Sequence, residues 1–294
     1  MGIEYVITIL TFTGITLIGV LGAYMVTGLT GLFSFGQAAF LAIGAYVSAV
    51  LMKDYQVALP FAMLAAIAVG VLCGLLVGLP TVRLRRDYIS LVTIGFGEAI
   101  IALLTNSASI TGGAMGLSGI PFPWPDGWGG LEPNAVWLIV VGISVVICLA
   151  VVVSYKYSKY GRQCLALRSD ELAAKSMGIN VTKLKLMTFL IAAGMTSYAG
   201  CLYAVKTSYV EPAAFGWTLS AEWIIIVFVG GINSLTGAVV SGLLLTTLPE
   251  FLRFAAEWRV VIYCVVVLLI INFRPSGLFG EWEINRLWKG GSSK

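Results

Sequence analysis

Histidine is absent from the sequence, and charged residues are scarce. None of the 294 residues is His, and Asp, Glu, Lys and Arg together make up 11%. The absence of His excludes His-based catalytic triads and His-ligated metal sites. The sequence also lacks the G-x-x-x-x-G-K-[ST] motif, so we expect the chain to bind no ATP through a P-loop and to hold no cofactor or metal of its own.

Motifs of known catalytic sites are missing as well. The sequence has no nucleophile elbow, no H-E-x-x-H and no G-x-G-x-x-G followed by a strand. Three glutamates in or near apolar runs, Glu98, Glu222 and Glu250, are too scattered to form a convergent acid–base set. We therefore predict that the chain is not an enzyme.

Cysteine is sparse and shows no paired spacing. The five cysteines are odd in number, and no two of them form a C-x-x-C pair. Four lie in apolar runs, so we interpret them as small packing residues.

Hydrophobic residues dominate the remainder. They make up 59% of the sequence, the mean hydropathy is +0.96, and several runs approach or exceed the roughly 20 residues that span a bilayer. We predict an all-α polytopic membrane protein, one transmembrane domain over residues 1–294, with about nine spans. Because three runs are short, eight or ten spans remain open. The predicted spans are residues 5–27, 37–52, 60–82, 88–106, 134–155, 184–205, 218–233, 236–251 and 259–273.

The first run is expected to be a span and not a cleaved signal peptide, because no basic segment precedes it and Glu4 lies at its start. The third run carries Gly70, Gly74 and Gly78 on one face. This small-residue face predicts close packing against another helix.

The longest basic, water-compatible interruption covers residues 156–185. It holds seven Lys or Arg and two acids, and we expect a helix of about eight residues within it. Ser169 is predicted to cap this helix, with Asp170 and Glu171 in its first turn. Gly178 is predicted to end it. Such a helix suits docking into a groove of a partner, and a plain connector lying on the lipid surface is the alternative.

Basic residues also predict the orientation. If the cluster Arg83, Arg85 and Arg86 is cytosolic, nine spans place the basic loop and four C-terminal residues on the same side: Arg274, Arg286, Lys289 and Lys294. The opposite side keeps Lys53, Lys206, Arg253 and Arg259. The N-terminus is then outside and the C-terminus cytosolic. Residues 107–133 lack Lys and Arg and contain Trp124 and Trp128, so we expect an irregular extracytoplasmic loop there.

A glycine-broken stretch, residues 28–36, separates the first two runs. Broken backbone at membrane depth is tolerated where protein or water covers it, and transporters place substrate contacts at such breaks. Ser34 and Gln37 are therefore candidates for a translocation pathway, and a plain cytosolic turn is the alternative. Gly31-x-x-Ser34 and Gly231-x-x-Ser234 both precede short runs, which hints at a two-fold internal repeat.

Other polar residues of the apolar runs extend the set of pathway candidates. Glu98 lies about ten residues into a run, where a carboxylate is costly unless it faces protein or water. A buried partner for an arginine, or a position near the end of a shorter helix, would also account for it. The remaining candidates are Thr93, Asn106, Glu222 and Asn233.

Five stretches together resemble one family. They are Gly31–Tyr46, Arg83–Tyr88 with Thr93–Glu98, Thr111–Pro121, Gly161–Ile179 and Val229–Gly237. On these stretches the chain resembles, over nearly its whole length, the LivM-type permeases of bacterial ABC importers for branched-chain amino acids. The resemblance implies the importer permease fold in the bacterial inner membrane.

The resemblance also implies partners and a coupling site. The partners are a second, similar permease, two cytosolic ATPase subunits that bind ATP and Mg, and an extracytoplasmic solute-binding protein. The central loop is similar to the EAA loop of these permeases, with Ala173, Ala174 and Gly178 in register. Leu172 replaces the usual Glu, so Asp170 and Glu171 are expected to supply its polar contact, and Arg168 joins the coupling set. A stand-alone transporter or channel, or an ABC permease for amides or urea, is the alternative.

Overall fold

Apolar helices make up most of the computed structural model, which describes residues 2–84, 86–124, 127, 132–251, 259–274 and 276–280. Arg85, Trp128, Arg253, Arg286, Lys289 and Lys294, named above, lie outside these residues. The longer helices are α1 (Ile3–Tyr24), α2 (Gln37–Lys53), α3 (Leu59–Thr81), α4 (Arg86–Asn106), α6 (Pro133–Tyr157), α9 (Val181–Thr207), α10 (Trp217–Gly230), α11 (Leu235–Phe251) and α12 (Arg259–Phe273).

Six segments within the described ranges are long and apolar enough to cross a membrane: Ile3–Leu29, Leu59–Thr81, Tyr88–Asn106, Pro133–Tyr157, Val181–Thr207 and Pro212–Gly230. Gln37–Lys53 and Leu235–Pro249 are shorter apolar helices. The prediction of a polytopic helical membrane protein is confirmed. The count of about nine spans stays a prediction, because the helices α2 and α11 are too short to qualify by length.

Helix α9 forms the centre of the bundle, with 78% of its apolar window buried. Small residues allow its neighbours to approach closely: a Cβ on Gly44 of α2 would overlap Ser197 O, and one on Gly200 of α9 would overlap Leu41 O. The predicted glycine face of α3 packs on α9 as expected. Gly70, Gly74 and Gly78 are buried, and a Cβ on any of them would meet α9 side chains.

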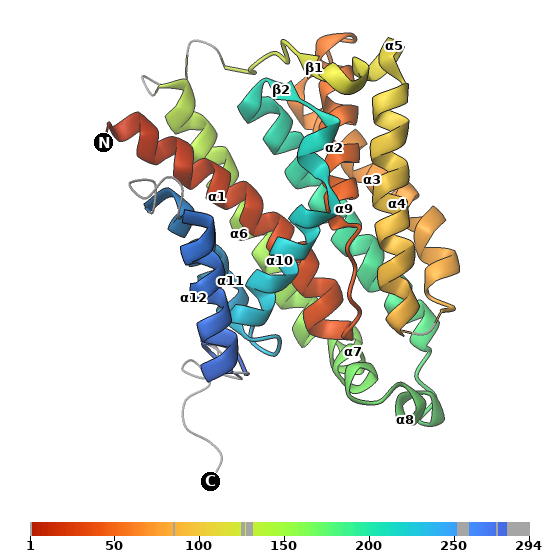
Figure 1. Cartoon of the computed structure of the whole chain (residues 1–294). Coiled ribbons are helices and arrows are strands. Elements are labelled where there is room, and N and C mark those ends of the chain that lie inside the picture. Colours follow the sequence, from red (N-terminus) through yellow and green to blue (C-terminus); the bar gives the residue numbers. More distant parts are fainter. Residues whose placement is uncertain are drawn as a thin grey trace.

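The two ends of the bundle differ in structure (Figure 1). At one end, β1 (Leu117–Ser118) pairs antiparallel with β2 (Tyr209–Val210), beside α5 (Ala108–Thr111), η2 (Gly113–Met115) and η3 (Pro212–Phe215). The predicted loop 107–133 is thus partly regular. At the other end lie α7 (Lys159–Ser169) and α8 (Glu171–Ser176).

The chain between α1 and α2 is a buried break. α1 continues beyond the predicted glycine boundary as the π-helix η1 (Met25–Leu29), and the backbone turns away at Gly31, where φ is +69°. The segment then runs back along the bundle to the start of α2 (Figure 1). Its side chains Thr30, Leu32 and Ser34 are at most 3% exposed, so protein covers this irregular backbone.

Candidate functional site

Helix α8 lies where the sequence predicted a short helix, but Asp170 caps it and Ser169 does not. Asp170 Oδ1 accepts hydrogen bonds from the amides of Leu172 and Ala173 at 2.8 and 3.0 Å. Ser169 instead ends α7 and donates to Leu165 O. Asp170 has the extended backbone of a cap residue, and its carboxylate also faces the positive end of the helix dipole. The helix has six residues instead of about eight.

Gly178 ends α8 as predicted. Its φ is +78°, a left-handed conformation that glycine adopts without strain. The Gly178 amide donates to Lys175 O at 3.0 Å, and the Ile179 amide donates to Ala174 O at 3.1 Å. These two bonds form a Schellman motif, which satisfies the last carbonyls of the helix.

Two apolar side chains on and directly after α8 are exposed. Leu172 is 77% exposed and Met177 is 82% exposed, whereas Ala174 is buried against the chain. Glu171 holds the helix in place by ion pairs of 2.9 Å with both Lys175 and Lys185. Burial alone would raise the pKa of Glu171, but hydrogen bonds and charges from the two lysines outweigh it and hold that pKa below its usual range.

Arg168, in the last turn of α7, connects this loop to the membrane helices. Its guanidinium donates to Gly28 O in η1, to Ile232 O at 3.3 Å beyond α10, and to the Asn233 Oδ1 atom. The positive charge thus lies at the C-terminal ends of two helices, where the dipole favours a cation. A predicted coupling residue, Arg168, and a predicted pathway residue, Asn233, are therefore in direct contact.

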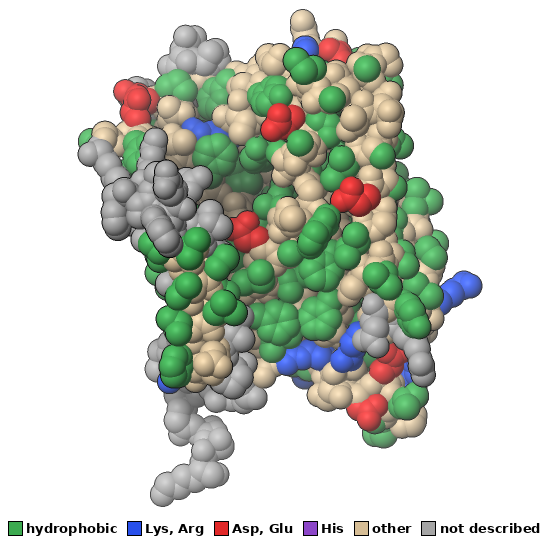
Figure 2. Space-filling view, in the orientation of Figure 1, with side chains coloured by type: hydrophobic (Ala, Val, Ile, Leu, Met, Phe, Trp, Pro, Cys, Tyr) green, Lys and Arg blue, Asp and Glu red, His purple; other side chains and the backbone are tan. Residues whose placement is uncertain are grey.

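Two further basic residues belong to this cluster, Lys156 and Arg86, which the sequence used only to predict the orientation and did not mark as site residues. Lys156 Nζ donates to Tyr24 OH at 2.9 Å and to Asn233 O at 3.4 Å. Arg86 donates to Arg168 O at 3.2 Å. Figure 2 shows Lys and Arg side chains gathered at the end where α7 and α8 lie. The only signal for Lys156 was its position directly after an apolar run, which many cytosolic lysines share.

The two glycine breaks meet at the same place. Gly31 and Gly231 both have positive φ, of +69° and +109°, and a Cβ on Gly28 would lie 3.2 Å from Ile232 O. Both breaks therefore contact each other and Arg168. The two halves of the predicted repeat are thus alike in structure at this point, because each Gly-x-x-Ser stretch follows one helix and precedes a short one.

Ser34, Gln37 and Thr93 are buried together near the start of α2. Ser34 and Gln37 are each 1% exposed and Thr93 is 0% exposed. Thr93 Oγ1 accepts from the Phe35 amide at 3.1 Å, which attaches the break to α4. This burial differs from that of an exposed turn, and the pathway role of Ser34, Gln37 and Thr93 stays a prediction.

The other pathway candidates lie apart from this cluster. Glu98 and Asn106 are exposed on a face of α4 that no described part of the chain covers, and Glu222 on α10 is half-buried. Glu98 is thus not a buried partner for an arginine. It makes no ion pair among the residues that the structure describes.

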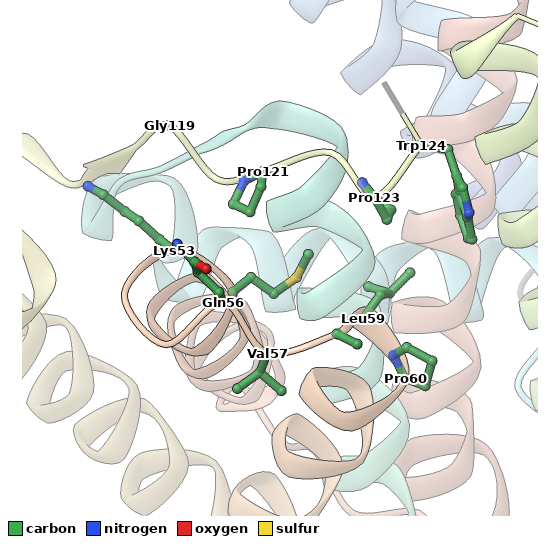
Figure 3. Close-up of a pocket in the computed structure, with 11 residues that line it drawn as sticks. Lys53, Gln56, Val57, Leu59, Pro60, Gly119, Pro121, Pro123 and Trp124 are labelled. Atoms are coloured by element: carbon green, nitrogen blue, oxygen red, sulfur yellow. The ribbon is translucent and has the colours of Figure 1, made fainter. Parts of the chain in front are cut away.

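A pocket of about 580 Å³ opens at the end of the bundle that carries the hairpin (Figure 3). One wall is the turn between α2 and α3, and the other is the extended segment after β1. The pocket combines the basic side chain of Lys53 with apolar and proline residues such as Pro121 and Trp124. In the figure these side chains come from the two walls and surround an open space.

Apolar helices and a basic loop bound to two helix breaks are features of a multi-pass membrane protein. Residues 5–271 match the family model described as "Branched-chain amino acid transport system / permease component". The chain belongs to this family and is a permease component.

Curated relatives agree with this assignment. Over 98% of this chain and 73% of the relative, the chain is 34% identical to the high-affinity branched-chain amino acid transport system permease protein LivM of Escherichia coli (strain K12). It is 33% identical, with the same coverage, to LivM of Salmonella typhimurium. It is 25% identical to the permease protein LivH of Escherichia coli (strain K12), over 94% of this chain and 96% of that protein. No solved structure matches the chain.

Proposed function

We propose that the chain is the permease subunit of an ATP-driven ABC importer that translocates branched-chain or related neutral amino acids delivered by a solute-binding protein. The observation that carries the proposal is the set of hydrogen bonds by which Arg168 joins the loop bearing α8 to both helix breaks. ATP hydrolysis is supplied by separate ATPase subunits, which hold the nucleotide and Mg. The permease itself converts their movement into opening and closing of the path.

In this mechanism α8 is the part that the ATPase moves. Leu172 and Met177 offer it an exposed apolar surface, and the Asp170 cap and Gly178 turn keep the helix rigid enough to transmit a push. α7 lies directly before α8 in the chain and moves with it. Arg168 at the end of α7 then pulls on the carbonyls of residues 28 and 232. Because these carbonyls belong to different breaks, one movement of α7 displaces both breaks.

A second permease subunit is the partner that we assign to the uncovered face of α4. An isolated carboxylate at the centre of a bilayer costs about 2.5–3.5 kcal/mol or more, so such residues face protein or water. Glu98 and Asn106 lie on this face with Gly95, and all three are exposed. A path between two permease subunits would place these polar groups in contact with water and solute.

The end of the bundle that carries α8 is proposed to face the cytosol of the bacterial cell, with nine spans, the N-terminus outside and the C-terminus inside. The hairpin end then faces the solute-binding protein, and the pocket beside Lys53 and Trp124 opens toward it. The basic cluster of Lys156, Arg86 and Arg168 on the cytosolic side is consistent with the positive-inside rule.

The test is uptake of labelled L-leucine by vesicles that contain the permease with its copurified ATPase and permease partners and the solute-binding protein. We expect accumulation that requires both ATP and the binding protein. Leucine flux driven by an ion gradient in vesicles of this chain alone would instead establish a stand-alone transporter.

A further inference from the structure

The start of α2 lies part-way along the bundle (Figure 1) and carries two buried polar groups without partners. Ser34 Oγ and Gln37 Nε2 make no hydrogen bond, although both side chains are only 1% exposed. Gly36, at the N-cap, offers no side chain to the first amides of this 17-residue helix. Buried polar groups are nearly always hydrogen-bonded, so unpartnered donors at one helix end indicate a group that binds there during function.

The second break provides a comparison within the same molecule. Ser234 occupies the same position in its Gly-x-x-Ser stretch, and its Oγ accepts from the Gly237 amide at 2.9 Å. α11 begins directly after Ser234, so this helix end is closed by its own cap. α2 begins three residues after Ser34, and the Ser34 hydroxyl is left without that role. The same motif thus caps one helix end with its own serine, whereas at α2 the Ala38 amide donates to Ser220 Oγ and the Ala39 amide to Gly36 O, and the Ser34 hydroxyl has no partner.

The N-terminal end of α2 favours an anion. The N-terminus of a helix carries partial positive charge, and the Ser34 hydroxyl and Gln37 amide add an O–H and N–H donors. Thr196 Oγ1 lies 3.0 Å from Gln37 Oε1 and 2.8 Å from Ala192 O, so α9 contacts one end of the Gln37 amide, and the other end, Nε2, has no partner. Half-helix N-termini that meet a substrate carboxylate recur in transporters.

We infer that Ser34, Gln37 and the N-terminus of α2 form the subsite that binds the carboxylate of the transported amino acid. This inference rests on the proposed function, because it takes an amino acid as the solute. The Ala38 amide already donates to Ser220 Oγ at 2.8 Å. The Ala38 amide is therefore not a free donor, and the donors assigned to the carboxylate are the Ser34 hydroxyl and the Gln37 side chain.

Helix α4 closes this subsite. Ser90 Oγ donates to Phe33 O at 3.0 Å, and the Phe35 amide donates to Thr93 Oγ1 at 3.1 Å. Both bonds join α4 to the break segment just before Ser34. A solute reaches the subsite when α4 separates from this segment, and the face of α4 with Glu98 lies on the outer side of the same helix.

The first experiment measures the melting temperature of the full-length chain in detergent with three probes. L-leucine carries both charged groups, 4-methylpentanoate keeps only the carboxylate, and 3-methylbutylamine keeps only the amine. A ligand that binds the folded state raises its melting temperature, so leucine and 4-methylpentanoate should each raise it and the amine should not. A response to the amine equal to that of the carboxylate, or no response to either carboxylate, overturns the inference.

Variants give a second readout that does not depend on transport. Ser34→Ala removes an unpartnered buried group, so it should raise the melting temperature without ligand by about 2–4 °C. Ser234→Ala removes a used cap and should lower it. Gln37→Leu removes the unpartnered Nε2 together with the Oε1 that contacts Thr196, so its response to ligand is the quantity compared. Both Ser34→Ala and Gln37→Leu should lose the response to 4-methylpentanoate. If Ser34→Ala is destabilised, or if either variant still responds to the carboxylate, the inference is wrong.

Uptake by the complete importer separates this inference from the proposed function. If the wild-type complex accumulates leucine and the Ser34→Ala and Gln37→Leu complexes do so about tenfold more slowly at saturating binding protein, both stand. Equal uptake by the variants overturns the subsite alone. Failure of the wild-type complex to accumulate leucine overturns the proposed function, while the melting experiment still decides whether a carboxylate binds.

Discussion

Arg168 joins parts of the chain that lie far apart in the sequence. It contacts carbonyls that lie 140 and 64 residues away in sequence, so one side chain holds two helix breaks against the cytosolic loop. Hydrogen bonds from charged groups contribute about 1.5–3 kcal/mol each. Loss of this side chain should therefore weaken the link between α7 and the breaks more than a typical surface substitution would.

We predict that Arg168→Ala lowers ATP-driven leucine uptake by about tenfold or more, while the ATPase activity that the binding protein stimulates persists. The physical reason is that α7 can still move but no longer pulls on both breaks. Arg162→Ala is the matched control, because exposed Arg162 donates to Tyr157 O within its own loop. Wild-type uptake by Arg168→Ala, measured beside Arg162→Ala, would contradict the role given to Arg168.

Glu171 carries a prediction about pH. Its pKa is lowered from 4.5 in the folded chain, so its ion pairs stabilise α8 at pH values above 4.5 and are lost as the pH falls through the lowered pKa. The protection factors of residues 170–178 against hydrogen exchange, which correct for the pH dependence of the intrinsic rate, should therefore fall in acid below that value. Glu171→Gln should show fast exchange already at neutral pH. The same acid response in the variant would show that Glu171 is not its cause.

At the scale of elements, α8 was predictable because its signals are local. Asp170, Glu171 and Gly178 lie within one short stretch. The identity of the cap was wrong, since Ser and Asp are both good N-caps, and the helix is two residues shorter than predicted. Helix α7 was not predicted, although Ser158 caps it by accepting from the Gly161 amide at 3.2 Å. Its polar composition gave no apolar periodicity that would have set it apart from a connector.

Non-local features could not be predicted from sequence. The hairpin pairs Leu117 with Val210, and no local pattern connects residues so far apart. The sequence placed Ser34 and Gln37 at a break, but their burial and missing partners depend on α4 and α9. Likewise, Asn233 was a candidate by its polarity alone, and its contact with Arg168 follows from where α7 packs.

The end of α8 gives a prediction at this scale. Gly178 has positive φ, and a Cβ there would meet nothing within 4 Å, so substitutions act through backbone strain alone. Gly178→Val should unravel the Schellman turn and abolish ATPase coupling, whereas Gly178→Asn should retain most of it because Asn tolerates this conformation. The coupling of each variant is measured by leucine uptake and by copurification of the ATPase. Equal behaviour of Val and Asn would contradict this account of the turn.

At the scale of the whole molecule, we propose that a second permease covers the exposed face of α4 and completes the path. On this proposal, Glu98→Gln should insert and fold like the wild type but lower uptake, because it removes a charge from the surface proposed to face that permease and the solute. Membrane yield and melting temperature provide the folding control. If the variant fails to fold, Glu98 is a structural residue and does not line the path.

The central claim is that the chain obtains its energy through α8 from separate ATPase subunits. The most direct measurement is leucine uptake by vesicles containing the complete importer, with ATP inside or outside, and with wild-type α8 or with Asp170→Lys and Glu171→Lys together. The account predicts ATP-dependent accumulation by the wild type, and loss of accumulation in the variant although it inserts normally. Accumulation by the variant at the wild-type rate, or by vesicles without any ATPase subunit, would contradict it.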